Sequence, residues 1–235
     1  LLEASKEFNI PEIILLEAIH DAPSILERFT YGKERYISFF QAAFLRHIRR
    51  DNVVYHGLAG QFFLKGISHA LKVRVITDME DRVRSKMLQE EISREQALRT
   101  IKGDDEERRK WSRNLYGIDT ADPALYDVVI RLRKITVGDA ADIICHTAGL
   151  AIFQTTFESQ KAMDDLVLAA EIKAALVDIK PDIQVHVKEG NVVIGGKVSP
   201  PDEQQMIDEM GRIARNIAGV NSVEIRARHA VDWTE

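Results

Sequence analysis

LKVRVIT, at residues 71–77, is a run of apolar and β-branched residues with the composition of a short strand. Two runs of the same kind lie before and after it along the chain, at residues 52–56 and 127–132. Patterns with helical spacing separate the runs, and Ser93 with Gln96 has the spacing of a capping box that opens one helix. Strands that alternate with helices predict an α/β fold with a parallel sheet.

Past residue 165 the pattern changes to that of a smaller domain. Residues 166–177 have helical spacing, and residues 183–187 alternate between apolar and polar side chains, as in a half-buried strand. A turn at 189–191 leads to a second strand, which predicts a hairpin, and a helix and a last strand follow. We therefore predict three segments: an α/β domain at 1–153, a polar linker at 154–164 and an αββαβ (α+β) domain at 165–229.

Composition argues against several classes of function. Of 235 residues, 45% are hydrophobic and the formal net charge is −5, so no basic face for nucleic acid is expected. Cys145 is the only cysteine, which rules out an internal disulfide and a zinc site built on paired cysteines. The seven histidines do not have metal-ligand spacing, and no run of about 18 apolar residues occurs. We expect no metal site, no nucleic-acid partner and no membrane-spanning helix.

Five short motifs occur in order along the first half of the chain: VVYHGLAG at 53–60, LKVRVI at 71–76, EDRV at 80–83, DEERRKWSRNLYG at 105–117 and DPALYDVVI at 122–130. This ordered set resembles the cytidylate kinase-like family, and the likeness extends over about residues 1–150. It implies a partial P-loop kinase-type sheet and an enzyme that transfers the γ-phosphoryl group of ATP to a nucleoside monophosphate such as CMP. Dependence on ATP in turn implies a cytoplasmic protein.

In the segment 105–117, the resemblance implies a lid helix whose charged side chains act on the phosphates. Asp105 and Arg108 match the family pattern and Arg113 lies nearby, so these three residues are the predicted catalytic set. Arginine suits this role because it neutralises charge on the transferring phosphoryl group. The alternative is an exposed helix face of mixed charge that has no catalytic role.

A second group of residues is predicted to bind nucleotide: Gly57, Leu58 and Gly60, with Arg109. The loop 57–60 follows a predicted strand end, which is where α/β sheets bind ligands. Many relatives have Gly-Arg-Gly where this chain has Gly57-Leu58-Ala59, and leucine cannot pair with phosphate. The acceptor nucleotide is therefore open, and the alternative is a plain turn between a strand and a helix.

The sequence contains no motif of the form G-x-x-x-x-G-K-[ST], the loop that holds ATP in P-loop kinases. It also begins without Met, so we expect a full-length form that carries this loop and binds ATP with Mg²⁺. For the chain as printed, we expect no cofactor and no phosphoryl transfer. The alternative is a kinase-like protein that is catalytically inactive and acts by binding. Exposed sheet edges in the first domain would favour a partner or a homo-oligomer.

Two motifs in the second domain, IQVHVKEGNVVIGGKV at 183–198 and IAGVNSVEI at 217–225, resemble the BON domain. The likeness covers residues 165–228. It implies a non-catalytic module that binds phospholipid surfaces or other small ligands. Such a module would regulate or target the kinase-like half of the chain.

Overall fold

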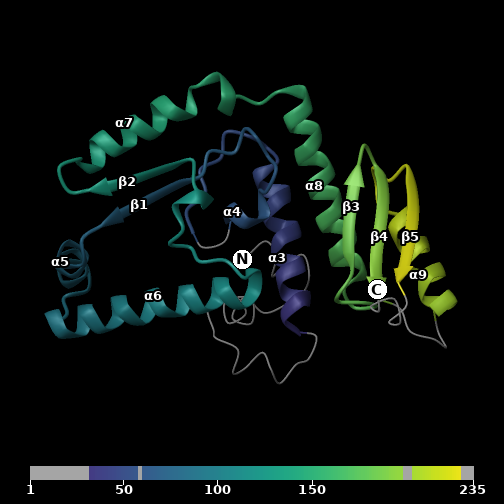
Figure 1. Cartoon of the computed structure of the whole chain (residues 1–235), viewed down its shortest axis with the longest axis horizontal. Coiled ribbons are helices and arrows are strands. Elements are labelled where there is room, and N and C mark those ends of the chain that lie inside the picture. Colours follow the sequence, from purple (N-terminus) through teal and green to yellow (C-terminus); the bar gives the residue numbers. More distant parts are fainter. Residues whose placement is uncertain (1–31, 58–59, 198–202, 229–235) are drawn as a thin grey trace, which may run out of the picture. The chain divides into compact units, whose positions relative to one another are not determined.

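The computed structural model describes residues 32–57, 60–197 and 203–228 (Figure 1). The described chain divides into two compact units. The first unit comprises residues 56–156, and the second unit comprises residues 32–55 together with 157–228. None of the helices in the described part of the chain combines the length and the apolar character needed to cross a bilayer.

The first unit is built on two parallel strands, β1 (Val73–Thr77) and β2 (Val128–Leu132), in which Val75 lies opposite Ile130. This confirms the predicted α/β arrangement for both runs. On this face β1 is less covered than β2, because Val75 is 49% exposed whereas Ile130 is 3% exposed. Parallel sheets normally carry helices on both faces. The remaining elements of the unit are α4 (Gly60–Phe63), α5 (Met79–Glu90), α6 (Arg94–Tyr116), η2 (Pro123–Leu125), α7 (Val137–Ala148) and η3 (Ala151–Phe153).

Helices α5 and α6 form the crossover between β1 and β2. Helix α6 begins at the predicted capping box: the Ser93 hydroxyl accepts from Gln96 N at 3.3 Å, and Ser93 N donates to Gln96 Oε1 at 3.0 Å. Such a box satisfies backbone N–H groups that have no partner within the helix. A small core of Val83, Ala97 and Ile101 joins the two helices. The orientation of α6 is therefore set by packing against α5.

The prediction of a strand at residues 52–56 is wrong. Residues 53–56 are irregular, and the side chain of Val54 is 97% exposed. A β-branched composition produces a strand only where a neighbouring strand supplies hydrogen bonds, and no described strand pairs with this run. The ring of Tyr55 instead contacts that of Phe44 edge to face, with 4.8 Å between the centroids.

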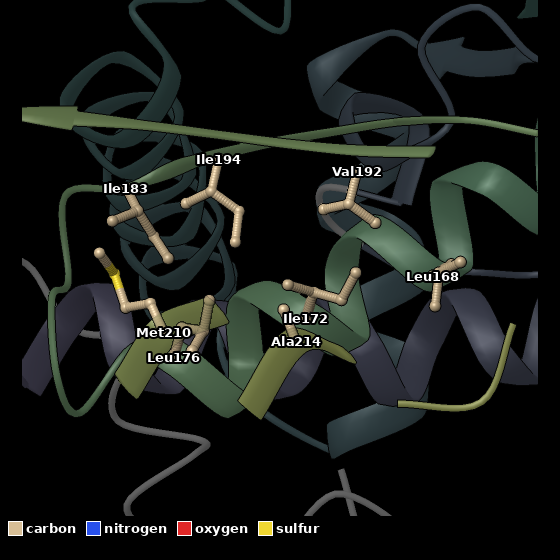
Figure 2. Packing of buried hydrophobic residues seen from close by; sticks show 8 residues of the cluster. All are labelled: Leu168, Ile172, Leu176, Ile183, Val192, Ile194, Met210 and Ala214. Carbon is tan, nitrogen blue, oxygen red and sulfur yellow. The ribbon is translucent and has the colours of Figure 1, made fainter. Parts of the chain in front are cut away.

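The second unit contains the predicted αββαβ order. It consists of α8 (Phe157–Leu176), β3 (Gln184–Lys188), β4 (Asn191–Lys197), α9 (Glu203–Arg215) and β5 (Ser222–Arg228). Strands β3 and β4 form the predicted antiparallel hairpin, and β5 pairs with β4 in parallel. One face of the sheet packs on α8 and α9 through a core that Figure 2 shows: Leu168, Ile172, Leu176, Ile183, Val192, Ile194, Met210 and Ala214.

Two features differ from the predicted division of the chain. Helix α8 begins at Phe157, so most of the segment 154–164 is helical, with Ser159 and Met163 buried. The second unit also includes a helix from the first half of the chain, α3 (Gly32–Ile48), which packs against α8. The spatial grouping therefore cuts across the predicted boundary between residues 1–153 and 165–229. The polar composition of residues 154–164 does not indicate a helix, because Ser159 and Met163 become buried only through contacts with other parts of the chain.

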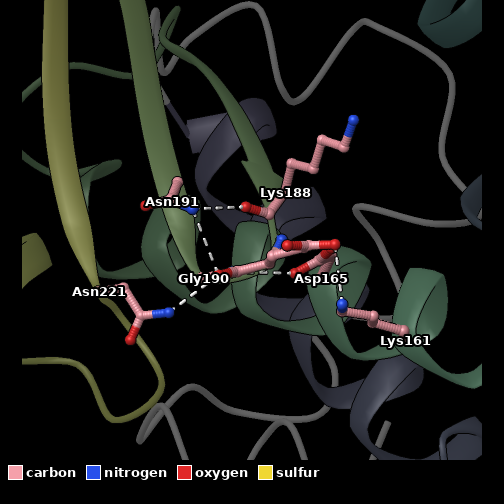
Figure 3. Close-up of polar contacts among 7 residues, drawn as sticks. Lys161, Asp165, Lys188, Gly190, Asn191 and Asn221 are labelled. Carbon is pink, nitrogen blue, oxygen red and sulfur yellow. Dashed lines mark hydrogen bonds and ion pairs between the residues drawn. The ribbon is translucent and has the colours of Figure 1, made fainter.

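The β3–β4 turn is held by hydrogen bonds from two other elements (Figure 3). The Asp165 carboxylate on α8 accepts from the backbone N–H groups of Glu189, at 2.9 Å, and Gly190, at 3.3 Å. From the loop before β5, Asn221 Nδ2 donates to Glu189 O at 2.9 Å and Asn221 N donates to Gly190 O at 2.8 Å. Gly190 has a φ of 74°, and a Cβ atom there would lie 2.6 Å from Gly219 O. Only glycine fits this junction without strain.

We predict that Gly190→Ala lowers the free energy of unfolding by about 2–4 kcal/mol, because alanine adds left-handed strain and a clash with backbone. Urea denaturation of the whole chain, followed by circular dichroism, measures the change. Gly195→Ala in β4 is the matched control, since a Cβ there meets nothing within 4 Å. Equal destabilisation by the two variants would show that the junction does not depend on glycine.

Candidate functional site

Helix α6 carries most of the predicted site residues, and one of its faces borders a shallow hollow of about 450 Å³. The α6 residues that line it recur every three or four positions, which places them on one side of the helix. They are Lys102, Asp105, Glu106, Arg109, Lys110 and Arg113, and Met79 at the start of α5 completes the lining. The hollow therefore lies between the beginning of α5 and a cationic stripe of α6, formed by Lys102, Arg109, Lys110 and Arg113.

Asp105 is held by Arg82 of α5 in a two-pronged ion pair. The guanidinium atoms Nη1 and Nη2 donate to the two carboxylate oxygens at 2.6 and 2.8 Å. The hydrogen bonds from Arg82 lower the pKa of Asp105 despite its partial burial, and those to Asp105 raise the pKa of Arg82. Asp105 is thus a fixed anion near neutral pH. Its geometry suits anchoring α6 to α5 rather than exchanging protons.

Two other cations of the stripe are neutralised by nearby acids. Arg113 Nη2 donates to Asp119 Oδ2 at 2.5 Å, and Lys110 Nζ lies 2.7 Å from Glu106 Oε1. A hydrogen bond from the backbone of Ala121 lowers the pKa of Asp119, and Arg113 lowers it further. These pairs are exposed, so a phosphate could compete with the carboxylates for the same cations.

Arg108 and Arg109 are exposed and have neither an ion pair nor a hydrogen-bonded side-chain partner among the described residues. Arg109 borders the hollow, whereas Arg108 does not, because neighbouring residues point about 100° apart around a helix. The structure therefore brings together Asp105, Arg109 and Arg113 on one face. Arg108 of the predicted catalytic set lies to the side of that face.

The predicted nucleotide-binding glycines lie elsewhere. Gly57 is exposed in the irregular segment, Gly60 is the buried first residue of α4, and Leu58 lies outside the described residues. No hydrogen bond or ion pair in the described chain joins these glycines to α6. The loop does not follow a strand, so the predicted position at the end of a sheet strand is wrong. Of the predicted nucleotide-binding set, Arg109 therefore lies with Asp105 and Arg113 at the hollow, whereas neither Gly57 nor Gly60 lines it.

Five residues at the hollow or its anchoring pair are not among the predicted site residues: Met79, Arg82, Lys102, Glu106 and Lys110. Arg82 was part of a recognised motif, but nothing in the sequence paired it with Asp105, 23 positions away. Lys110 lies in the run of mixed charge whose alternative interpretation is an exposed helix face, and Lys102 lies outside the recognised motifs. The signal that could have found them is their helical spacing: Lys102 lies three residues before Asp105, and Lys110 lies three residues before Arg113. Among the described residues, no three His, Cys, Asp or Glu side chains are grouped closely enough to hold a metal ion.

We predict that Asp105→Asn lowers the free energy of unfolding at pH 7 by about 1 kcal/mol, since a partly exposed ion pair is lost. Because the pKa of Asp105 is lowered in the folded state, its stabilisation is present above the ordinary carboxyl pKa. It is lost as the pH falls from about 4 through the folded-state pKa. The difference between the two proteins in urea denaturation should therefore shrink at acid pH.

Glu106→Gln is the control for this experiment, because its exposed pair with Lys110 should stabilise the fold less. A difference between Asp105→Asn and the parent that stays constant from pH 7 to pH 3 would contradict the anchoring role of the Arg82–Asp105 pair.

Two protein-family models match the chain. The model of the Cytidylate kinase-like family matches residues 1–134, which include β1, β2, α5 and α6, and the model of the BON domain matches residues 164–228. Comparison with curated proteins gave no match. The first match covers more than half of the 235 residues. The chain therefore belongs to the cytidylate kinase-like family and carries a BON domain that follows the kinase-like region.

Proposed function

We propose that the kinase-like region takes part in ATP-dependent phosphoryl transfer to a nucleoside monophosphate of the CMP type, with α6 contacting the phosphates. The observation that carries this proposal is the position of Arg109, which lines the hollow without an ion-pair partner among the described residues. Arg113 and Lys102 line the same hollow. Guanidinium groups bind phosphate oxygens through two parallel hydrogen bonds, and they stabilise charge that develops during transfer.

The anchoring of α6 supports the same proposal. Catalysis of phosphoryl transfer consists mainly of positioning and of electrostatic stabilisation, so a phosphate-binding arginine must be held on a rigid element. The Arg82–Asp105 pair and the core around Val83 fix α6 on α5 close to Arg109. Arg82 and Asp105 are positioning residues in this account, while Arg109 is the residue proposed to contact phosphate.

The printed sequence contains no P-loop motif that would hold ATP with Mg²⁺. Mg²⁺ is usually held by phosphates, water and one or two carboxylates. Asp105 and Glu106 are the carboxylates that line the hollow, but both are paired with cations. They do not fit a dedicated Mg²⁺ site, so we derive no step through the metal. Because the reaction consumes ATP, we propose the cytoplasm as its compartment.

The second candidate function is that of a kinase-like binding protein without catalysis, acting through its BON domain on a phospholipid surface or a small ligand. Two observations favour it. The sequence contains no G-x-x-x-x-G-K-[ST] motif, and Leu58 stands where many relatives have the arginine of Gly-Arg-Gly. Phosphate binding at Arg109 is compatible with both functions, so turnover has to be measured separately from binding.

Without a P-loop the printed chain is expected to hold a nucleoside triphosphate only weakly, through the cations of α6. We predict that Arg109→Ala lowers this weak affinity about tenfold, because a hydrogen-bonded charge on phosphate contributes about 1.5–3 kcal/mol. Titration of the whole chain with a fluorescent ATP analogue measures the dissociation constant. Arg99→Ala is the matched control, since Arg99 is an exposed arginine of α6 that does not line the hollow. An equal effect of both variants would show that only the overall charge matters.

We predict that the printed chain does not phosphorylate CMP in the presence of ATP and Mg²⁺, because it lacks a backbone cradle for the triphosphate. A coupled assay for ADP release, with a bacterial cytidylate kinase as the positive control, measures this. Turnover that scales with the amount of purified chain, and that is lost in Arg109→Ala, would overturn the prediction.

A further inference from the structure

Helix α8 buries apolar side chains on two opposite faces. Leu168, Ile172 and Leu176 belong to the core beneath the β3–β4–β5 sheet. A second set on α8 is also buried but lies outside that core: Met163, Val167, Ala170 and Ala174. At about 100° per residue, the five steps from Met163 to Leu168 turn the helix by about 140°, so the two sets face in different directions. The BON sheet accounts for only one of them.

Helix α3 covers the second face. It packs against α8, and both helices, labelled in Figure 1, belong to the second unit. The α3 residues that are buried include Ser38, Phe39, Ala42 and Leu45, and the exposure of Ala42 and Leu45 is 0%. Alanines on both helices allow their backbones to approach closely, which suits a dense helix–helix seam.

The borders of this seam are complementary in charge. Three ion pairs join α3 or the residue after it to α8 or the residues after it, each with the arginine on the α3 side. The nitrogen–oxygen distances are 2.6 Å for Arg35–Asp178, 2.9 Å for Arg46–Glu171 and 2.7 Å for Arg49–Asp164. The partners occur in opposite order along the two helices, so the helices are antiparallel. Arrangements of this kind contribute more to the choice of partner and register than to affinity.

The seam joins a segment matched by one family model to a segment matched by the other. Helix α3 lies within residues 1–134, matched by the cytidylate kinase-like family, and most of α8 lies within residues 164–228, matched by the BON domain. We propose that the outer face of α8 is a docking surface of the BON domain and that α3 of the kinase-like region is its specific occupant. The structural BON unit of this chain then comprises residues 32–55 in addition to 157–228. This inference is independent of nucleotide binding.

A charge-exchange cycle in the whole chain tests the proposal. Arg46→Glu and Glu171→Arg are made singly and together, and amide hydrogen exchange is measured by mass spectrometry. Each single change should raise exchange in α3 and in residues 163–177 about two- to fivefold, because an ion pair becomes a repulsion. The double variant should return exchange to within about twofold of the parent, since the pair is restored with its signs reversed.

The matched control exchanges the charges of an exposed ion pair in the first unit, Arg94 with Glu80, in which Nη2 and Oε1 are 2.7 Å apart. Arg94→Glu and Glu80→Arg should leave exchange in α3 and α8 unchanged. The proposal is overturned if the double variant of Arg46 and Glu171 fails to recover protection, or if the control pair has the same effect on α8.

A seam variant gives a second measurement that does not depend on exposed charges. Ala42→Glu places a carboxylate where the side chain is fully buried, and it should raise exchange in both α3 and α8 at least about tenfold. Ala141→Glu, at an exposed position of α7, is the control. Unchanged α8 exchange in Ala42→Glu refutes the docking, and if that variant does not fold, the charge-exchange cycle decides.

Discussion

The burial of α8 on two opposite sides is the constraint on which the second unit depends. A helix that is apolar on both sides is unstable in water unless it has two partners, and here these are the β3–β4–β5 sheet with α9 and the helix α3. Burying a Leu or Ile side chain contributes about 1.5–3 kcal/mol, so losing either partner would expose side chains whose burial holds the unit together. The Asp165 carboxylate then ties the same helix to the β3–β4 turn. One helix thus connects the sheet, its turn and a segment of the kinase-like region.

The first unit has a smaller core and a more exposed sheet than the second unit. Its sheet has two described strands, and Val75 and Val129 are 49% and 41% exposed, which is unusual for a parallel sheet. Helix α6 is held on α5 by two ion pairs, Arg82–Asp105 and Arg94–Glu80, and by a core of few residues. Such an arrangement leaves the charged face of α6 accessible. Access to solvent is what the proposed phosphate contact on α6 would need, since the ligand must reach the guanidinium groups before they are desolvated.

The comparison of α6 with α8 shows how charge is used in two ways. On α6, Asp105 is partly buried and its pKa is lowered by Arg82, so the pair acts as a fixed anchor. The arginines near it remain exposed and available to a ligand. Between α3 and α8, by contrast, exposed ion pairs frame an apolar seam. Such pairs contribute little energy individually, and their value lies in selecting one antiparallel register.

Local interactions in the sequence determined much of this protein. The capping box at Ser93, the alternation around Val185 and the turn at Gly190 depend on residues a few positions apart, so they could be predicted without a structure. The motifs that identified the two families are local in the same sense. Tertiary structure decided the rest: that residues 53–56 are not a strand, that Arg82 meets Asp105, and that α3 belongs with α8. These outcomes depend on which segments lie side by side in space, and the periodicity of a single segment carries no information about its partner.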